Sequence, residues 1–217
     1  MSPLRRFWLS NFFVGVGKFL FLQIGRLIWG YSRWHCSPVN RKPYALEIIE
    51  TLEEMIKAGT IGKGYIVEVG CGRGDIIGNI RYGKRIGIDI DPHAINAAKF
   101  LHPDMTFIKG EVDAIPIDNI DVLIMVGWLH GITPEAVHDL IQHALQKTKM
   151  FVFDVFLDEH EQPLEGYVDE TSHAHTHNGH FLCDEEFRLV CQGINLPSST
   201  TGRPALKHVE FWIRKEQ

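Results

Sequence analysis

The stretch "IVEVGCGRGDIIGNI", Ile66 to Ile80, decides the fold class of this sequence. It places three glycines, at positions 70, 72 and 74, directly after an apolar run. Glycine loses more backbone entropy on folding than any other residue, so this concentration indicates a tight turn or a close approach to the backbone. Asp75 stands where the dinucleotide fingerprint G-x-G-x-x-G needs its last glycine, and no Gly-Lys-Ser/Thr of a P-loop follows. The loop is therefore not expected to hold a pyrophosphate.

Short apolar runs alternate with amphipathic or capped segments along the rest of the chain. Strands are expected over residues 65–69, 85–90, 105–109, 121–126, 149–157 and 207–214. Helices are expected over 43–57, 75–81, 91–101, 133–147 and 184–191, two of them opening with a cap followed by proline. This alternation predicts an α/β fold with a doubly wound, mostly parallel sheet. We expect one domain over residues 41–217, preceded by an apolar helical extension and lid over residues 1–40.

Composition narrows the class of protein. Hydrophobic residues make up 45% and charged residues 23%, as in a folded soluble domain. The net charge of −5 gives little attraction to nucleic acid, so a nucleic-acid partner is not expected. The four cysteines form no C-x-x-C pair, which is typical of reduced thiols in a cytoplasmic protein.

Residues 7–30 are dense in apolar and aromatic side chains. Lys18 and Arg26 interrupt this segment, so no uncharged run reaches the ~18 residues that a membrane span requires. The segment also lacks a cleavage site of small residues, so a signal peptide is not expected. At helical spacing one apolar stripe forms, made of Leu9, Phe13, Val16, Leu20, Ile24 and Leu27. Two interpretations stay open: a helix packed on the domain or on a second copy as a homodimer, and an in-plane anchor on a membrane surface. The second would make the protein peripheral at the inner membrane.

Acidic residues follow the first strands of the expected sheet. Asp89 ends the second strand, where a carboxylate binds both hydroxyls of a ribose. Glu111 follows the third strand and offers an acceptor to an adenine amino group, with Val112 as an apolar face beside it. Glu68, with the glycines, would hold a charged amino-acid tail. Adenine, ribose and a cationic tail without phosphates describe S-adenosylmethionine.

Residues from about 44 to 214 resemble class I S-adenosylmethionine-dependent methyltransferases. The motifs "VEVGCGRGD", "GIDIDPHAI", "FIKGEVDAIP" and "DVLIMVGWLHGI" occur in the family's order and spacing. A fainter likeness, through "RWHCSPVNRKPYALEIIETL", extends to bacterial methyltransferases linked to surface-polysaccharide synthesis. The resemblance implies a Rossmann-like, seven-stranded sheet whose last strand is antiparallel.

The resemblance also implies a set of cofactor-binding positions. They are Glu68, Gly70, Gly72, Asp89, Ile90, Glu111, Val112 and Gly127. Cys71 lies in the same loop and is counted with them, as a small filler and not as a nucleophile. Glu111 stands where the family has aspartate. The glutamate keeps the acceptor oxygens but has a side chain that is longer by one methylene group.

Candidate acceptor-side residues lie after the fourth strand and in two other segments. His130 is the candidate general base, because the unperturbed imidazole titrates near neutral pH. Trp34 and Tyr44 are expected in a lid, and His177 and His180 in the histidine-rich "SHAHTHNGHFL", as substrate contacts. Alternate histidines there could hold a metal ion, but no carboxylate stands at a fixed spacing to them, so no metal site is expected.

The sequence thus predicts a methyltransferase acting on oxygen of a sugar or another small hydroxylated acceptor. Two alternatives remain: a soluble natural-product methyltransferase with a dimerising N-terminal helix, and a non-catalytic cofactor-binding partner subunit. A nicotinamide dehydrogenase is a distant third.

Overall fold

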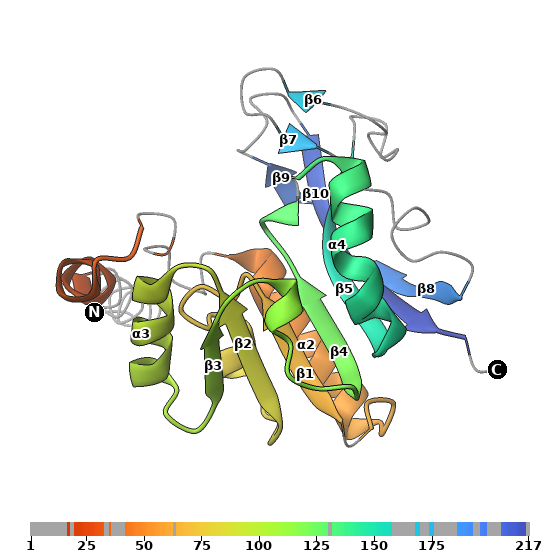
Figure 1. Ribbon diagram of the computed structural model, residues 1–217, viewed down its shortest axis with the longest axis horizontal. Helices are drawn as coiled ribbons and strands as arrows, with labels where there is room; N and C mark the ends of the chain where they lie inside the picture. The colour runs from red at the N-terminus through yellow and green to blue at the C-terminus, as the bar shows by residue number, and fades with distance from the viewer. Residues whose placement is uncertain are drawn as a thin grey trace, which may run out of the picture.

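The computed structural model describes residues 17, 20–32, 35, 42–62, 64–129, 132–157, 168–169, 174–175, 186–192, 196–198 and 205–215. One sheet runs through the centre of the molecule, in the order β3-β2-β1-β4-β5-β10-β8, with the short β9 paired to β10 (Figure 1). Its strands are β1 (Tyr65–Val69), β2 (Arg85–Asp89), β3 (Thr106–Lys109), β4 (Ile120–Met125), β5 (Thr148–Leu157), β8 (Phe187–Gln192), β9 (Leu196–Ser198) and β10 (Ala205–Arg214). A separate two-stranded ribbon joins β6 (Val168–Asp169) and β7 (Ala174–His175).

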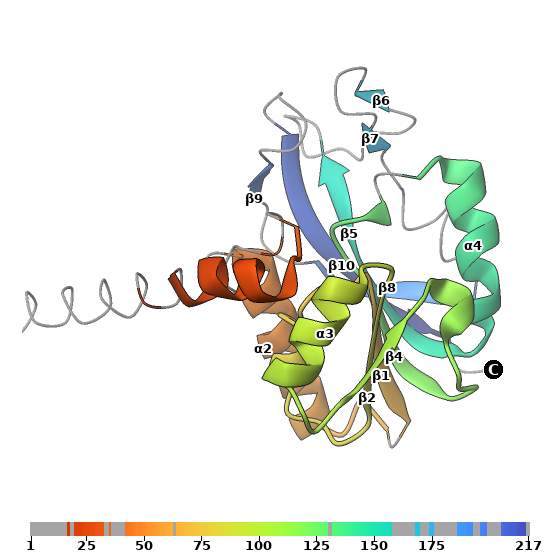
Figure 2. The same ribbon diagram turned by 60° about the vertical axis from the view of Figure 1, so that its left-hand side comes forward.

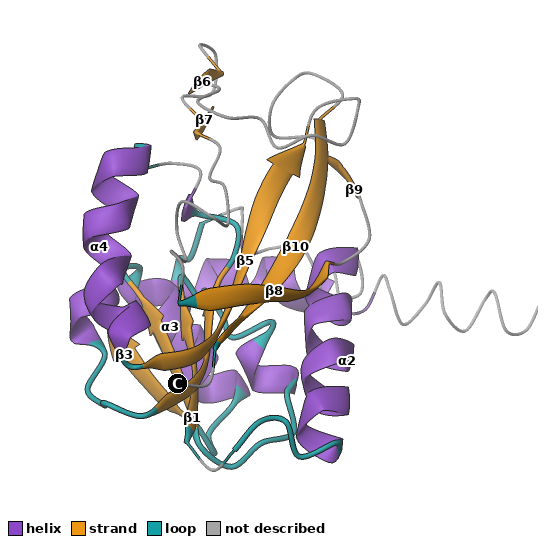
Figure 3. Ribbon diagram, turned by 90° about the vertical axis from the view of Figure 1, so that its right-hand side faces the viewer, coloured by secondary structure: helices purple, strands orange, loops and turns teal. Residues whose placement is uncertain are grey.

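The direction of the strands confirms the predicted doubly wound architecture. Strands β3, β2, β1, β4 and β5 are parallel to one another. The last strand, β10, pairs antiparallel with both β5 and β8, and the long β5–β10 pair stands out in Figure 3. The chain builds β1 to β3 toward one edge and then returns to place β4 beside β1. That reversal is the topological switch point at which open α/β sheets bind their ligands.

Helices cover both faces of the sheet and create a hydrophobic core on each. The helices α2 (Pro43–Lys57) and α3 (Pro92–Leu101) share one core with alternate strand residues such as Ile66, Val122 and Val152. The helix α4 (Pro134–Gln146) covers the other face, where Val67, Leu123 and Phe151 point. Because side chains of a strand alternate between faces, a strand covered on both sides is buried throughout, as in β4, where every side chain except that of Asp121 is apolar.

Two predicted helices are wrong. In place of a helix over 75–81, the chain forms only a 3-10 turn, η3 (Ile77–Asn79), because the Ile77 N–H donates to the buried Glu68 carboxylate at 2.9 Å. Residues 187–191 of the predicted helix 184–191 belong instead to the strand β8. Its residues pair with β10, and Phe187 is buried under the α4 face of the sheet, so tertiary pairing overrides the local helical pattern.

The N-terminal segment is helical over residues 20–29 and lies beside α3 (Figure 2). It docks through Leu22 and Trp29, while Tyr31 packs against Ala94 and Ala97 of α3. The predicted stripe does not make this contact: Leu27 on that stripe is 85% exposed. Among the described residues, no helix has the length and hydropathy to cross a membrane. The predicted domain boundary at residue 40 lies outside the described residues.

Candidate functional site

The glycine loop that follows β1 is built on left-handed backbone. Gly70, Gly72 and Gly74 have φ values of +75°, +53° and +78°, a region that side-chain-bearing residues rarely adopt. The N–H groups of Gly70 and Cys71 donate to the carbonyl of Ile88 at 2.8 and 3.0 Å, which folds the loop over the end of β2. The three glycines therefore serve the turn itself.

Asp89 braces this loop against β2. One carboxylate oxygen accepts from the Gly72 N–H at 2.7 Å and the other from the Asp91 N–H at 2.8 Å. The side chain is 7% exposed, so the carboxylate is held in one orientation beside the glycines. Asp91 in turn caps α3 by accepting from the His93 N–H at 2.8 Å.

A pocket of about 680 Å³ opens at the carboxyl ends of β1, β2, β3 and β4. This volume falls within the range of small-molecule sites. Six of the predicted cofactor-binding residues line it: Gly70, Asp89, Ile90, Glu111, Val112 and Gly127. The structure thus brings together residues that lie up to 57 positions apart in the sequence, as the order of the strands predicts.

The other three predicted cofactor positions, Glu68 in β1 and Cys71 and Gly72 in the loop, do not line the pocket. Glu68 is buried, and its carboxylate accepts from the Ile77 N–H. Burial raises the pKa of Glu68 to about 8. Burial also raises the pKa of the Cys71 thiol well above its ordinary value, which suits a filler and not a nucleophile. Gly72 is covered by the His35 ring, whose Nδ1 lies 2.7 Å from where a Cβ on Gly72 would stand.

Sequence reasoning missed Trp128, which lines the pocket next to Gly127. Its indole Nε1 donates to the Val69 carbonyl at 2.7 Å, and its ring fills the place where a side chain on Gly70 would stand. Gly127 has φ +87° and donates its N–H to Asp154 at 2.8 Å. The available signal was the aromatic residue directly after the glycine in "VGWLHG".

The segment before α2 closes one side of the pocket. Ser32 and His35 are among its lining residues. His35 Nε2 lies 3.9 Å from a carboxylate oxygen of Asp91, and burial lowers the pKa of His35, so its ring is neutral at pH 7. His35 lies within the predicted lid segment, but the sequence analysis singled out its neighbour Trp34 as the substrate contact and not His35.

An ion cluster fastens this segment to the glycine loop. The buried Arg73 guanidinium donates to Asp75 at 2.9 Å, and Lys42 donates to the same carboxylate at 2.7 Å. The Arg73 guanidinium carbon also lies 5.6 Å from the centroid of the Tyr31 ring. Contacts from residues 31, 35 and 42 thus converge on residues 72–75.

The predicted acceptor-side residues are only partly within the described chain. Tyr44 is half-buried at the start of α2, where it packs against the core of that face and does not line the pocket. Burial, and then the nearby Asp154 carboxylate, raise the pKa of Tyr44, so its phenol stays protonated at neutral pH. His130, Trp34, His177 and His180 lie outside the described residues. Within the described residues, no group of three His, Cys, Asp or Glu side chains is arranged to hold a metal ion.

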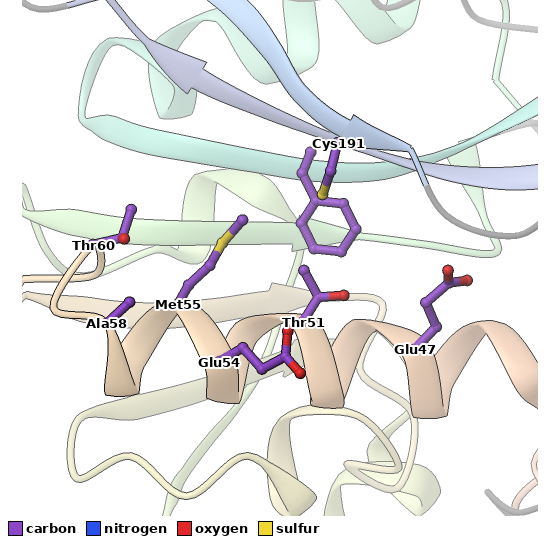
Figure 4. Close-up of a pocket in the computed structure, with 8 residues that line it drawn as sticks. Glu47, Thr51, Glu54, Met55, Ala58, Thr60 and Cys191 are labelled. Atoms are coloured by element: carbon purple, nitrogen blue, oxygen red, sulfur yellow. The ribbon is translucent and has the colours of Figure 1, made fainter.

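A second pocket, of about 420 Å³, lies between α2 and the β8–β10 edge of the sheet (Figure 4). Glu47, Thr51 and Glu54 approach it from the helix, and Cys191 faces them from β8. It contains none of the predicted site residues.

Comparison with known proteins agrees with this geometry. Residues 66–150 match the family model of the methyltransferase domain. The chain has no significant sequence match among curated proteins.

Solved structures with the same fold are remote in sequence. Magnesium protoporphyrin IX methyltransferase from Synechocystis, crystallised with bound SAH, is 13% identical with a TM-score of 0.60, over 85% of this chain and 89% of that one. The N-methyltransferase NodS from Bradyrhizobium japonicum, also with SAH, is 11% identical with a TM-score of 0.60, over 83% and 89%. A methyltransferase from Clostridium acetobutylicum is 8% identical with a TM-score of 0.59, over 80% and 92%.

The family match covers β1 to the start of β5, the part of the chain that carries the glycine loop and the pocket acids. Residues 66–150 of this chain therefore match a methyltransferase domain, and two of the solved structures that share the fold of the chain hold bound S-adenosylhomocysteine.

Proposed function

We propose that the protein transfers a methyl group from S-adenosylmethionine to a hydroxyl oxygen of a sugar or another small hydroxylated acceptor. The observation that supports the proposal most directly is the pocket at the switch point, where Asp89 and Glu111 converge with an open glycine at 127. When bound, the sulfonium cofactor supplies an activated methyl carbon. The protein has to bind and align the reactants and to exclude water.

The pocket residues fit the parts of such a cofactor. Asp89 is held by two backbone N–H groups, which leaves a fixed carboxylate beside the pocket for ribose hydroxyls. Glu111 offers an acceptor to the adenine amino group. Ile90, 66% exposed at the pocket edge, and Val112 supply apolar surface for the base. Gly127 has no atom within 4 Å of the place where a side chain would stand, so its backbone can be approached closely.

His130 is the proposed general base for the acceptor hydroxyl. It follows Leu129, which is 1% exposed in the α4-side core, at the end of the segment that carries Gly127 and Trp128. A neutral imidazole there would take the hydroxyl proton as the oxygen attacks the methyl carbon. His177, His180, Trp34 and Tyr44 are proposed acceptor contacts.

The acceptor atom is the part of the proposal that the fold leaves open. The similar structures include a magnesium protoporphyrin IX methyltransferase and an N-methyltransferase, so one fold serves different acceptors. Oxygen is favoured by the histidine that follows β4 and by the histidines at 173–180. We place the protein in the cytoplasm, where thiols such as Cys71 and Cys191 stay reduced.

Release of S-adenosylhomocysteine, measured on a panel of sugars, phenols, amines and thiols, tests the function. We expect turnover with hydroxylated acceptors. His130→Ala should lower kcat ~100-fold with the cofactor Kd unchanged, as expected for loss of a general base. His143→Ala, which removes an exposed histidine from the last turn of α4, is the matched control.

Three outcomes contradict parts of the proposal. Cofactor binding without turnover on any acceptor would favour the partner-subunit interpretation. Turnover on amines alone would remove the oxygen assignment. If His130→Ala kept the wild-type kcat, His130 would not be the general base, and the rate of methyl transfer would come from alignment of the reactants alone.

A further inference from the structure

The helical turns at residues 20–29 expose an apolar face. Leu27 is 85% exposed and Ile28 68%, while Leu20, Ile24 and Phe21 are 53%, 54% and 47% exposed. Spacings of three, four and seven residues place these side chains on one side of a helix. We call these five residues the outer face.

The outer face is not the result of a loosely attached helix. The opposite side of the same turns is packed on the domain: Leu22 is 6% exposed, and its carbonyl accepts from the Tyr31 hydroxyl at 2.7 Å. The centroid of the Trp29 ring lies 5.2 Å from the centroid of the Phe100 ring on α3. The helix therefore already has its intramolecular partner, and Figure 2 shows it at the margin of the body, next to α3.

The charge of the chain is divided unevenly about this segment. Seven of the 22 Lys and Arg residues, and none of the 27 Asp and Glu residues, precede Glu47. The remaining residues 47–217 carry 15 basic and 27 acidic residues. A basic apolar segment thus precedes a strongly acidic domain. Three of the five tryptophans, residues 8, 29 and 34, belong to the basic part.

We propose that the outer face binds an anionic membrane surface, with the helix lying in the plane of the interface. Helices that lie in a membrane interface combine exposed apolar side chains with Lys and Arg. Tryptophan is enriched at the boundary between the lipid headgroups and the hydrocarbon core. Lys and Arg near an anionic leaflet strengthen the attraction. A symmetric dimer through the same face would bring two segments of seven positive charges together, which like-charge repulsion opposes.

The outer face is linked to the cofactor pocket by a short path. Ser32 and His35, which follow the helix, line that pocket, and Lys42 bonds to Asp75 of the glycine loop. A membrane-bound helix therefore holds the pocket close to the lipid surface. The membrane proposal itself does not depend on methyl transfer and is tested without it.

Co-sedimentation of the full chain with vesicles tests the proposal. We expect the protein to pellet with vesicles of about 30% phosphatidylglycerol in phosphatidylcholine, and at least tenfold less with pure phosphatidylcholine or in ~0.5 M NaCl. The double variant Leu27→Gln/Ile28→Gln should bind the anionic vesicles at least tenfold more weakly. Both side chains are largely exposed, so the fold should persist, and an unchanged thermal unfolding midpoint verifies it. Leu189→Gln, an exposed apolar residue on β8, is the matched control.

Charge is tested separately. Arg26→Glu should weaken binding to anionic vesicles, whereas Arg188→Glu on β8 should not, since both side chains are exposed but only Arg26 lies on the helix. Wild-type protein that stays in the supernatant with anionic vesicles would overturn the proposal. So would a dimer in gel filtration that Leu27→Gln/Ile28→Gln dissociates while vesicle binding is absent, because the outer face would then be a subunit interface.

Discussion

At the residue scale, two acids on adjacent strands have different environments although both stand near strand ends. Asp89 lies at the pocket with both oxygens bonded to loop N–H groups. Glu68 points to the α2 side of the sheet. There its carboxylate accepts a hydrogen bond from the Ile77 N–H, at the start of the short 3-10 turn that follows the loop. The sequence analysis assigned both to the cofactor, because strand alternation alone does not tell which acid the following turn will use. The structure gives Glu68 a position in the interior.

Glu68 should make the stability of the protein depend on pH. Burial raises its pKa to about 8 from an ordinary value of 4.5. Between these values the native state holds a proton that the unfolded chain has lost, so the free energy of unfolding falls as pH rises, by at most about 1.4 kcal/mol per pH unit. Glu68→Gln keeps an acceptor for the Ile77 N–H and cannot ionise, so this slope should disappear.

Urea unfolding over about pH 5 to 8.5, the window set by these two pKa values, measures the difference between the two proteins. Glu54→Gln, at an exposed position of α2, should retain the wild-type slope. Parallel curves for wild type and Glu68→Gln would show that Glu68 is ionised in the folded state across this range.

Gly127→Ala tests the close approach of a ligand to the end of β4. Gly127 and Gly59 both have left-handed backbone, at φ +87° and +75°, and neither has an atom within 4 Å of the position that a Cβ would occupy. Both alanine variants should lose about 1–2 kcal/mol of stability through backbone strain. Only Gly127 lines the pocket, so only Gly127→Ala should weaken cofactor affinity in calorimetry, by tenfold or more. Equal affinities in the two variants would remove Gly127 from the cofactor site.

At the element scale, the N-terminal helix and the segment after it act as one structural unit with α3 and the glycine loop. Trp29 and Tyr31 join the helix to α3, and Tyr31 also lies over Arg73 of the loop. The apolar periodicity of residues 7–30 predicted a helix with one apolar stripe but left open what that stripe contacts; in the structure its described members, Leu20, Ile24 and Leu27, face away from the domain. Periodicity measures hydrophobicity, while the docked side was decided by close packing at Gly25 and by the hydrogen bond of the Tyr31 hydroxyl.

Gly25→Ala should undock this helix. A Cβ at Gly25 would stand 2.6 Å from the Tyr31 hydroxyl and 3.1 Å from the Trp29 ring, so overpacking of about 1–3 kcal/mol should exceed the roughly 1 kcal/mol gained in helix propensity. Trypsin should then cleave after Arg26 several-fold faster than in the wild type. Gly17→Ala, where nothing lies within 4 Å, gains the same propensity without the clash and should not accelerate cleavage. Slower cleavage in Gly25→Ala would contradict the packing.

At the scale of the whole molecule, a ligand that binds only the native state should stabilise the protein. S-adenosylhomocysteine at about 100 times its Kd should add about 2.7 kcal/mol, or roughly 5–10 °C in the unfolding midpoint for a chain of this size. NADH at the same concentration should give no shift, because the loop lacks the dinucleotide fingerprint. A thermal scan with each ligand measures this. A shift with NADH alone would restore the dehydrogenase interpretation.

The sequence by itself determined the succession of strands and helices in the methyltransferase half, its doubly wound parallel sheet and the position of its pocket. Glycines, caps and apolar runs are local signals, and the parallel arrangement brings the carboxyl ends of β1, β2 and β4 together whatever the details of packing. Only the tertiary structure decided that residues 187–192 pair as a strand, that Glu68 turns inward, and that Trp128 and His35 cover the glycines. Each of these depends on a partner distant in the chain, and local propensity carries no information about which distant group will be adjacent.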